Sequence, residues 1–228
     1  MDDTEKNKGE KMVNPEQIKQ AVIKGKYKEI SKLVENTLKN GVKAMNILEE
    51  VLYPSMGTVG DKFSSGEYFI PDLILAAKAM QAAMDILKPY LVGKKTKQSG
   101  LVVMCTIEGD LHDVGKNLVN IMLEGSGFKV IDLGIDVKAQ KFVEAVKKYK
   151  PQILGISGLL TTTLANVPKV LEALKKAGLR EKVLVGVGGA PVTQDFVNRV
   201  GADLYAKDAN QAAKVFTKAI SKQRQSTQ

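Results

Sequence analysis

The sequence predicts an N-terminal bundle of α-helices followed by an α/β domain with a doubly wound, parallel five-stranded sheet. Two observations support this fold class. Apolar residues recur with a helical period before residue 90, whereas beyond residue 100 short Val/Ile/Leu runs alternate with amphipathic segments. A polar, glycine-ended stretch at 93–100 separates the two patterns and is typical of an interdomain linker.

Residues 14–92 carry the signals of four helices joined by short loops, which predicts a small bundle. The first helix has Asn14 as its cap, Pro15 in its first turn and Gln17 three residues after the cap. A bend is expected near Pro54, because a proline inside a helix removes a backbone hydrogen bond. The four segments are bounded by Asn14 and Gly25, Gly25 and Asn40, Ala44 and Phe63, and Pro71 and Pro89.

Residues 101–221 alternate between strand and helix patterns. Near-continuous apolar runs are typical of strands covered on both faces, so a parallel sheet with right-handed crossovers is expected. The predicted strands are 101–107, 129–133, 153–157, 183–187 and 204–206. The predicted helices are 116–124, 139–148, 164–177, 194–200 and 210–221. A polar tail at 1–13, expected to be disordered, precedes the two domains, and a second tail at 222–228 follows them.

Composition and charge exclude several classes of function. A polar N-terminus and the lack of an apolar run near 18 residues predict neither a secretion signal nor a membrane span. The single cysteine, Cys105, lies in an apolar run, so we expect a buried thiol and a cytoplasmic protein. The net charge is +9, but the lysines are spread along the chain, which favours solvated faces over a nucleic-acid surface. Docking onto an acidic protein stays open.

Three predicted strand ends lead into unusual loops, at 109–115, 157–163 and 186–193, where open α/β sheets bind ligands. The first loop holds His112, the only histidine of the chain. Taken alone, a histidine beside a carboxylate after a strand is more often a capping residue than a ligand. The first loop lacks G-x-G-x-x-G, which disfavours a dinucleotide site. A phospho-acceptor receiver domain would leave His112 and the other two loops without roles.

The three loops form one ordered motif. Asp110-x-His112-x-x-Gly115 is followed after 41 residues by Ser157-x-Leu159, and after 28 more by Gly188-Gly189. This motif resembles that of the corrinoid proteins of methyltransferase systems for methylamines, methanol, methoxylated aromatics or betaines, and is similar to the cobalamin-binding module of methionine synthase. The resemblance covers 14–220 and implies a helical cap on a Rossmann-like, flavodoxin-like B12-binding domain. The implied cofactor is cobalamin or a related corrinoid, whose cobalt alternates between methylcob(III)alamin and cob(I)alamin.

The resemblance implies that His112 is the lower axial ligand of cobalt, and no residue of this chain is expected to be catalytic. Neutral imidazole is a good donor to cobalt. Asp110 suits the role of a carboxylate that accepts the other ring N–H, which fixes the tautomer of the ligand. Thr163 stands where methionine synthases have a serine hydroxyl that completes the relay. The threonine keeps the hydroxyl, but its extra methyl group restricts the rotamer.

The resemblance also implies contacts between the loops and the nucleotide tail of the corrinoid. Ser157 is expected to donate a hydrogen bond to the base, and the paired glycines remove side chains where the tail passes. The expected cofactor-binding residues are Gly109, Leu111, Asp113, Val114, Gly115, Ser157, Leu159, Thr161, Gly188, Gly189, Tyr205 and Ala206. In the segment 60–71, Phe63 and Ile70 match the apolar residues that shield the upper corrin face in the family, where excluding water protects the reactive cobalt.

The implied function is that of a methyl carrier. Such a protein accepts a methyl group on Co(I) from a substrate-specific methyltransferase and passes it to a second methyltransferase that uses tetrahydrofolate or a thiol. A reductive activase would be a further partner. The 228 residues contain no (β/α)₈ barrel, so we expect a carrier without a substrate-binding catalytic domain of its own. Two alternatives stay open, a B12-dependent sensor and a corrinoid storage or delivery protein.

Overall fold

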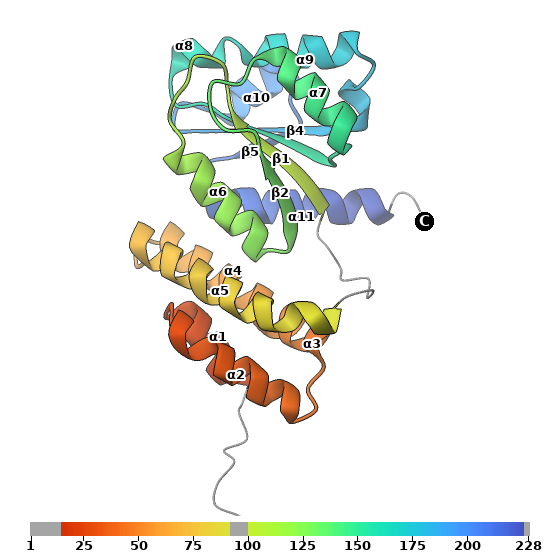
Figure 1. Ribbon diagram of the computed structural model, residues 1–228. Helices are drawn as coiled ribbons and strands as arrows, with labels where there is room; N and C mark the ends of the chain where they lie inside the picture. Colours follow the sequence, from red (N-terminus) through yellow and green to blue (C-terminus); the bar gives the residue numbers. More distant parts are fainter. Residues whose placement is uncertain (1–14, 92–99, 226–228) are drawn as a thin grey trace, which may run out of the picture. The chain divides into compact units, whose positions relative to one another are not determined.

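The computed structural model describes residues 15–91 and 100–225, which form two compact units, each described here by itself (Figure 1). The first unit holds residues 15–59 and 70–91, and the second holds 60–69 and 100–225. The predicted tail at 1–13, the Asn14 cap, most of the linker at 93–100 and the last residues of the tail at 222–228 lie outside the described residues. Among the described helices, none is long and apolar enough to cross a membrane.

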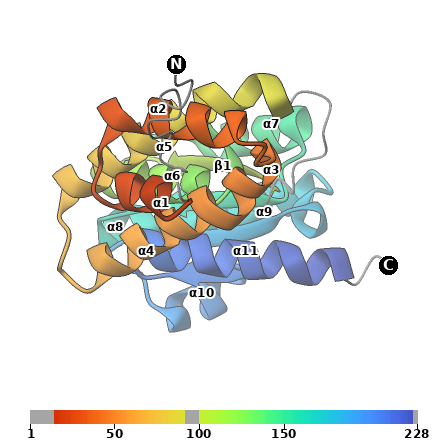
Figure 2. The ribbon, with the colours of Figure 1, turned by 90° about the horizontal axis from the view of Figure 1, so that it is seen from below.

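The first unit is helical, as predicted, and α1 and α2 pack against α5, which Figure 1 and Figure 2 both show. Its core is made of fully buried aliphatic side chains such as Ile18, Ile30 and Leu73. The helices are α1 (Pro15–Ile23), α2 (Tyr27–Lys39), α3 (Ala44–Asn46), the π-helix η1 (Ile47–Leu52), α4 (Tyr53–Ser64) and α5 (Ile70–Leu91). The last residues of α4 belong to the second unit.

Two prolines affect these helices differently. Just before Pro54, where a bend was expected, the backbone forms the π-helical turn η1, which accommodates a ring that cannot donate to the preceding turn. Pro89 was expected to end the last helix, but α5 continues through it to Leu91. Because Pro89 lies in the final turn, its missing N–H removes a single hydrogen bond and the helix does not stop there.

The second unit confirms the predicted α/β class. Its five strands are all parallel and lie in the order β2-β1-β3-β4-β5. The strands are β1 (Gly100–Thr106), β2 (Phe128–Asp132), β3 (Ile153–Ser157), β4 (Leu184–Gly188) and β5 (Leu204–Ala206). The helices are α6 (Val114–Gly125), α7 (Ala139–Tyr149), α8 (Thr161–Leu164), α9 (Val167–Lys176), η2 (Arg180–Lys182), α10 (Gln194–Val200) and α11 (Ala209–Gln225).

One predicted helix, 164–177, is instead divided into α8 and α9. The break falls at Asn166, whose side-chain amide donates to the carbonyl oxygen of Glu108 at 3.0 Å. Pro168 follows in the first turn of α9, where its missing N–H costs nothing. The break therefore ties the start of α9 to the loop that follows β1.

The strand register places alternate side chains of the sheet in rows on its two faces. On one face Val103, Cys105 and Leu154 pack into a core with residues of α7, α9 and α10. The other face is covered by α6 and α11 (Figure 1). Its outer row, at the carboxyl ends of the strands, is Thr106, Ser157, Gly188 and Ala206. Its next row inward is Met104, Gly155, Gly186 and Leu204. Small residues thus dominate this face near the strand ends.

Cys105 is expected to resist alkylation in the folded chain. Its side chain is fully buried, and burial and the charge of Asp132 raise the pKa of its thiol well above the usual value, although Lys116 opposes them. Iodoacetamide should therefore label Cys105 at least about 100-fold more slowly in buffer than in urea, as followed by mass spectrometry. Labelling in buffer at the rate of a free thiol would contradict this packing.

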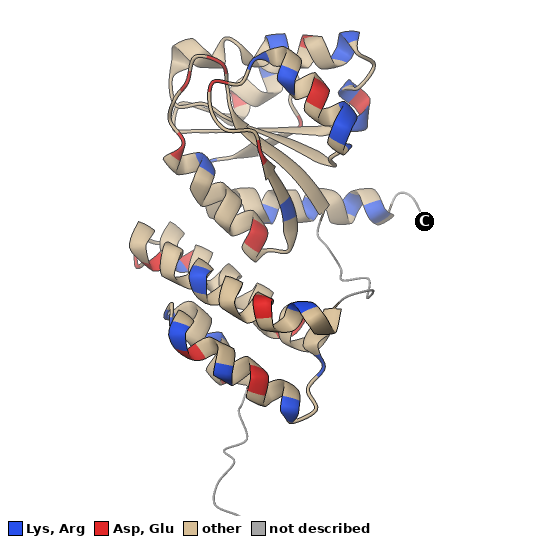
Figure 3. Ribbon diagram, in the orientation of Figure 1, with Lys and Arg blue, Asp and Glu red and all other residues tan. Residues whose placement is uncertain are grey.

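The basic residues are spread over several helices in both units (Figure 3). In the second unit they include the lysines in the last turns of α7 and α9. Favourable interaction of cations with the carboxyl end of a helix accounts for lysines in those turns.

Candidate functional site

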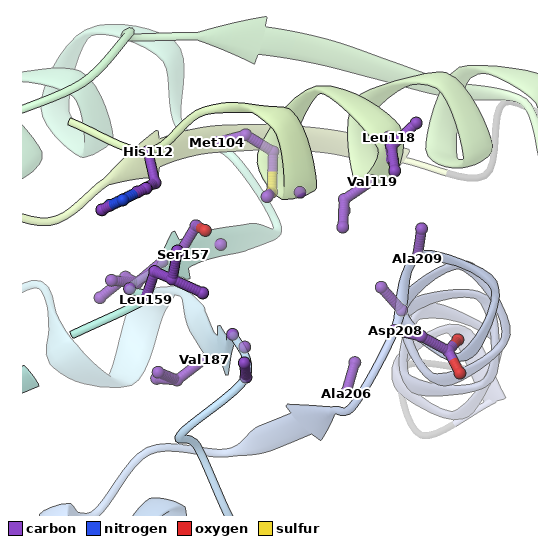
Figure 4. A pocket seen from close by; sticks show the side chains of 18 of the residues that line it. Met104, His112, Leu118, Val119, Ser157, Leu159, Val187, Ala206, Asp208 and Ala209 are labelled. Carbon is purple, nitrogen blue, oxygen red and sulfur yellow. The ribbon is translucent and has the colours of Figure 1, made fainter. Parts of the chain in front are cut away.

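A pocket of about 540 Å³ lies on the face of the sheet that α6 and α11 cover (Figure 4). Glycines of β3 and β4 form part of its sheet wall, and small residues of α11, Ala209 and Ala212, form part of its helical wall. Most of the residues that the sequence singled out line it. These are Phe63, Leu111, His112, Asp113, Val114, Gly115, Ser157, Leu159, Gly188, Gly189 and Ala206.

His112 lies in the loop between β1 and α6, and about half of its side chain, 54%, is exposed. Its Nδ1 is 2.7 Å from Oδ1 of Asp110, and the same oxygen accepts the backbone N–H of His112 at 3.0 Å. Because the carboxylate engages Nδ1, the ring is held in the tautomer that carries hydrogen there. No hydrogen bond joins Nε2 to another described residue, so its lone pair is available to a metal.

Asp110 is fully buried and connects the loops after β1 and β3. Its Oδ2 accepts the backbone N–H groups of Leu159 at 2.6 Å and Leu160 at 3.3 Å, and the Thr163 hydroxyl lies 3.1 Å away. Burial alone would raise the pKa of this carboxyl. The hydrogen bonds from the His112 and Leu159 backbone, the imidazole and the hydroxyl outweigh burial and lower its pKa well below the usual range. Asp110 is therefore a fixed anion behind the imidazole.

Thr163 lies beside this carboxylate, at the position that the resemblance implied. Its side chain is nearly buried, and its Oγ1 lies within hydrogen-bond distance of both Asp110 Oδ2 and the carbonyl oxygen of Leu160, at 2.9 Å. A hydroxyl has a single hydrogen, so Thr163 donates to only one of these acceptors at a time. The extra methyl group of threonine does not prevent the contact with the carboxylate.

Three further side chains hold the His112 loop, and none was identified from the sequence. The buried hydroxyl of Thr106 donates to the carbonyl oxygen of His112 at 3.0 Å. Asp136 accepts the N–H of Gly109 at 2.7 Å, and Asn166 anchors the neighbouring carbonyl. The sequence signal for Thr106 was a hydroxyl at the end of an apolar strand, which is a common place for a buried polar group to find a loop partner.

Some predicted residues lie apart from the pocket lining. Tyr205 packs with the core on the opposite face of the sheet, because it lies between Leu204 and Ala206 and side chains alternate along a strand. A side-chain contact between Tyr205 and a ligand in the pocket is therefore not supported. Thr161 is exposed at the start of α8. Ile70 belongs to the first unit, and its role at an upper face stays a prediction.

The inner part of the pocket was not predicted from the sequence. Met104 of β1, Gly155 of β3, Gly186 of β4 and Phe216 of α11 all line it. The available signal was a glycine inside each strand followed by another small residue two positions later, in Gly155-x-Ser157 and Gly186-x-Gly188. Glycine inside a strand often marks a place where another group approaches closely.

The residues present fit a corrinoid. A flat macrocycle needs an apolar surface around the axial ligand, and exposed side chains of Leu111, Val114, Leu159 and Leu160 supply one beside His112. A Cβ on Gly189 would overlap the carbonyl oxygen of Gly158, so the two loops meet at closest backbone contact. Space is left instead in the pocket, where a Cβ on Gly115 would meet nothing within 4 Å. The available imidazole, the apolar residues around it and the adjoining pocket are together the features of a cobalamin-binding α/β protein.

Comparisons with known proteins agree with this class. Residues 100–214 match a family model described as a B12 binding domain, and residues 15–88 match a second model with the same description. Trimethylamine corrinoid protein 2 of Methanosarcina mazei is 44% identical over 184 residues, which cover 80% of this chain and 84% of that protein.

Two solved structures are also similar. A cobalamin-binding protein from Desulfitobacterium hafniense has a TM-score of 0.75 and 40% identity, covering 89% of this chain and 96% of that one. The methanol:cobalamin methyltransferase complex MtaBC from Methanosarcina barkeri has a TM-score of 0.79 and 31% identity, covering 93% of this chain and 80% of that one. The chain belongs to the B12-binding family, among the corrinoid proteins of methyltransferase systems.

Proposed function

We propose that this chain, as a corrinoid methyl carrier, takes its methyl group from a methylamine through a substrate-specific methyltransferase and delivers it to a second methyltransferase. The observation that carries this proposal is the half-exposed His112 imidazole, fixed at Nδ1 by the buried Asp110 carboxylate at 2.7 Å beside a pocket of about 540 Å³. The cobalt of the bound corrinoid supplies the chemistry of accepting and releasing the methyl group.

The residues of the chain hold and tune the lower ligand. Asp110 orients the ring so that Nε2 points outward, and its negative charge increases the donor strength of the imidazole. Thr163 and the Leu159 N–H keep the Asp110 carboxylate in place. These contacts thereby fix the carboxylate that orients the imidazole of His112.

The pocket between α6 and α11 is the proposed site of the nucleotide tail. Ser157 presents its hydroxyl from the end of β3, and Figure 4 shows this side chain beside the pocket. Gly188 and Gly189 leave the adjoining wall without side chains. Phe63 lines the same pocket, and its proposed role is to exclude water from the corrin.

The similar proteins suggest the partners. Relatives that are 39–44% identical are trimethylamine and dimethylamine corrinoid proteins, which favours a methylamine as the methyl donor. The similar structure from Methanosarcina barkeri is a complex with a methyltransferase, which favours a partner enzyme of that kind here. The proposed acceptor enzyme uses tetrahydrofolate or a thiol, and a reductive activase would restore the cobalt after accidental oxidation.

Methyl transfer tests the proposal directly. The chain, loaded with reduced corrinoid, should be methylated by tri-, di- or monomethylamine in the presence of the matching methyltransferase. The absorption spectrum of the cofactor follows the reaction, and methanol with its own methyltransferase serves as the competing donor. A loaded chain that no methylamine methyltransferase turns over would contradict the proposed donor. Inactivity with every donor would favour the sensor or storage alternatives.

His112 permits an unusually clean control, because it is the only histidine in the chain. In the Co(II) form, the nitrogen splitting of the electron paramagnetic resonance signal should change from a triplet to a doublet when the protein carries [¹⁵N]histidine. His112→Ala should remove the histidine coupling. A nitrogen splitting that stays a triplet after [¹⁵N]histidine labelling would mean that the nitrogen belongs to the cofactor's own base, and the ligand assignment would be wrong.

A further inference from the structure

We infer that the inner end of the pocket selects corrinoids whose lower base has an apolar outer edge, as a methylated benzimidazole has, over those with a purine base. This inference rests on the proposed function, in which the nucleotide tail enters the pocket between α6 and α11. It concerns residues that the tail would meet at full depth, beyond the loops that carry the sequence motif.

The depth of the pocket is set by two large side chains that lie over strand glycines. A Cβ on Gly155 would overlap the Met104 sulfur and lie 3.0 Å from its Cε. A Cβ on Gly186 would lie 2.8 Å from Cε1 and Cζ of Phe216. Met104 and Phe216 therefore fill the row that the two glycines leave open, and a base lying along β3 and β4 ends against a thioether and an aromatic ring.

The polar side chains of the pocket lie at its outer end only. Those among its lining residues are His112 and Asp113 after β1, Ser157 at the last position of β3, and Lys207 and Asp208 after β5. Further in, the lining has no side-chain donor or acceptor apart from the weakly accepting thioether of Met104, which points into the pocket (Figure 4). The strand backbone there is already paired within the sheet.

This distribution of polarity discriminates between bases. The outer edge of a purine carries ring nitrogens and an exocyclic group that lose water on entering the pocket and find no partner there. A benzimidazole edge loses nothing, and a sulfur next to an aromatic ring is a favourable contact. The chain should therefore bind cobalamin, whose base is dimethylbenzimidazole, at least about tenfold more tightly than the corresponding corrinoid with adenine.

The test measures dissociation constants of the cofactor-free chain for three corrinoids by absorbance titration. They are cobalamin, its adenine analogue and cobinamide, which lacks a lower base. Met104→Gln puts an amide at the inner end and should reduce the preference for cobalamin to about threefold or less, because the purine edge gains a partner. The matched variant Met104→Leu should keep the tenfold preference whatever its absolute affinity, and cobinamide should bind all three chains alike.

Equal affinity of the unaltered chain for cobalamin and its adenine analogue would overturn the inference. A preference that Met104→Gln leaves intact would also overturn it, since the selection would then not arise at this end of the pocket. Failure of the unaltered chain to bind even cobinamide is a different result, because it would refute the proposed function and remove the basis for any selectivity.

Discussion

Replacing Asp110 with alanine should lower the free energy of unfolding of the second unit by about 3 kcal/mol. The carboxylate is fully buried, and it accepts hydrogen bonds from the backbone N–H groups of His112 and Leu159. It also contacts the imidazole of His112 and lies within hydrogen-bond distance of the Thr163 hydroxyl. Without it, these part-buried donors lose a charged acceptor, and the buried space that the carboxylate filled is left empty. Labelling of Cys105 in increasing urea measures the effect, because this thiol is buried in the same unit.

The pH dependence of stability gives a second readout. Because the pKa of Asp110 is lowered by folding, the unfolded chain binds the proton more tightly. The stabilisation is therefore fully present above the unfolded pKa of about 3.9, and it is lost as the pH falls from there towards the folded pKa. Asp110→Asn keeps the shape but has no charge to protonate, so the acid-induced loss of stability should be smaller in this variant than in the unaltered chain.

Glu144→Gln is the matched control, since it removes one carboxylate from the exposed surface of α7. It should change the unfolding free energy by less than about 0.5 kcal/mol. Two results would refute the role given to Asp110. One is an Asp110→Ala variant as stable as the control. The other is an Asp110→Asn variant that loses as much stability at acid pH as the unaltered chain.

Most of the fold was predictable because its signals are local. Strand β3 was predicted to the residue, and β1 and β4 to within one residue, since each is a short run of branched apolar residues. The break between α8 and α9 was not predictable in this way. It depends on the contact between Asn166 and Glu108, which are far apart in the sequence and meet only in the folded chain.

The residues of the site also differ in how far the sequence could predict them. His112, Asp110 and Thr163 were implied by the resemblance of the loop motif to the corrinoid proteins, and the structure brings all three together. The inner pocket was missed because it depends on strand register: Met104 meets Gly155 only through the pairing of β1 with β3. Tyr205 was misplaced for a related reason. All three residues of β5 are apolar or aromatic, so the sequence does not indicate which of them face the pocket.

Gly189→Ala should be the most disruptive single methyl addition in the site. The residue has φ +136°, which L side chains rarely adopt, and a Cβ there would overlap the Gly158 carbonyl oxygen and lie 2.8 Å from its carbonyl carbon. Both neighbours are backbone atoms, so relief requires the loops after β3 and β4 to separate. We expect a loss of about 3 kcal/mol or more in the stability of the second unit. Corrinoid affinity should fall by at least about tenfold, because both loops line the pocket.

Gly201→Ala is the control for a methyl group added at a positive φ without a close contact. Gly201 also has a positive φ, +77°, at the end of α10, but a Cβ there would meet nothing within 4 Å. This variant carries the backbone strain alone and should cost about 1 kcal/mol with corrinoid affinity unchanged. The excess loss in Gly189→Ala then measures the close approach of the two loops together with the greater backbone strain at φ +136°. If the two variants were equally stable and bound corrinoid equally well, the loops would be free to part, and a tight glycine contact would not shape the pocket.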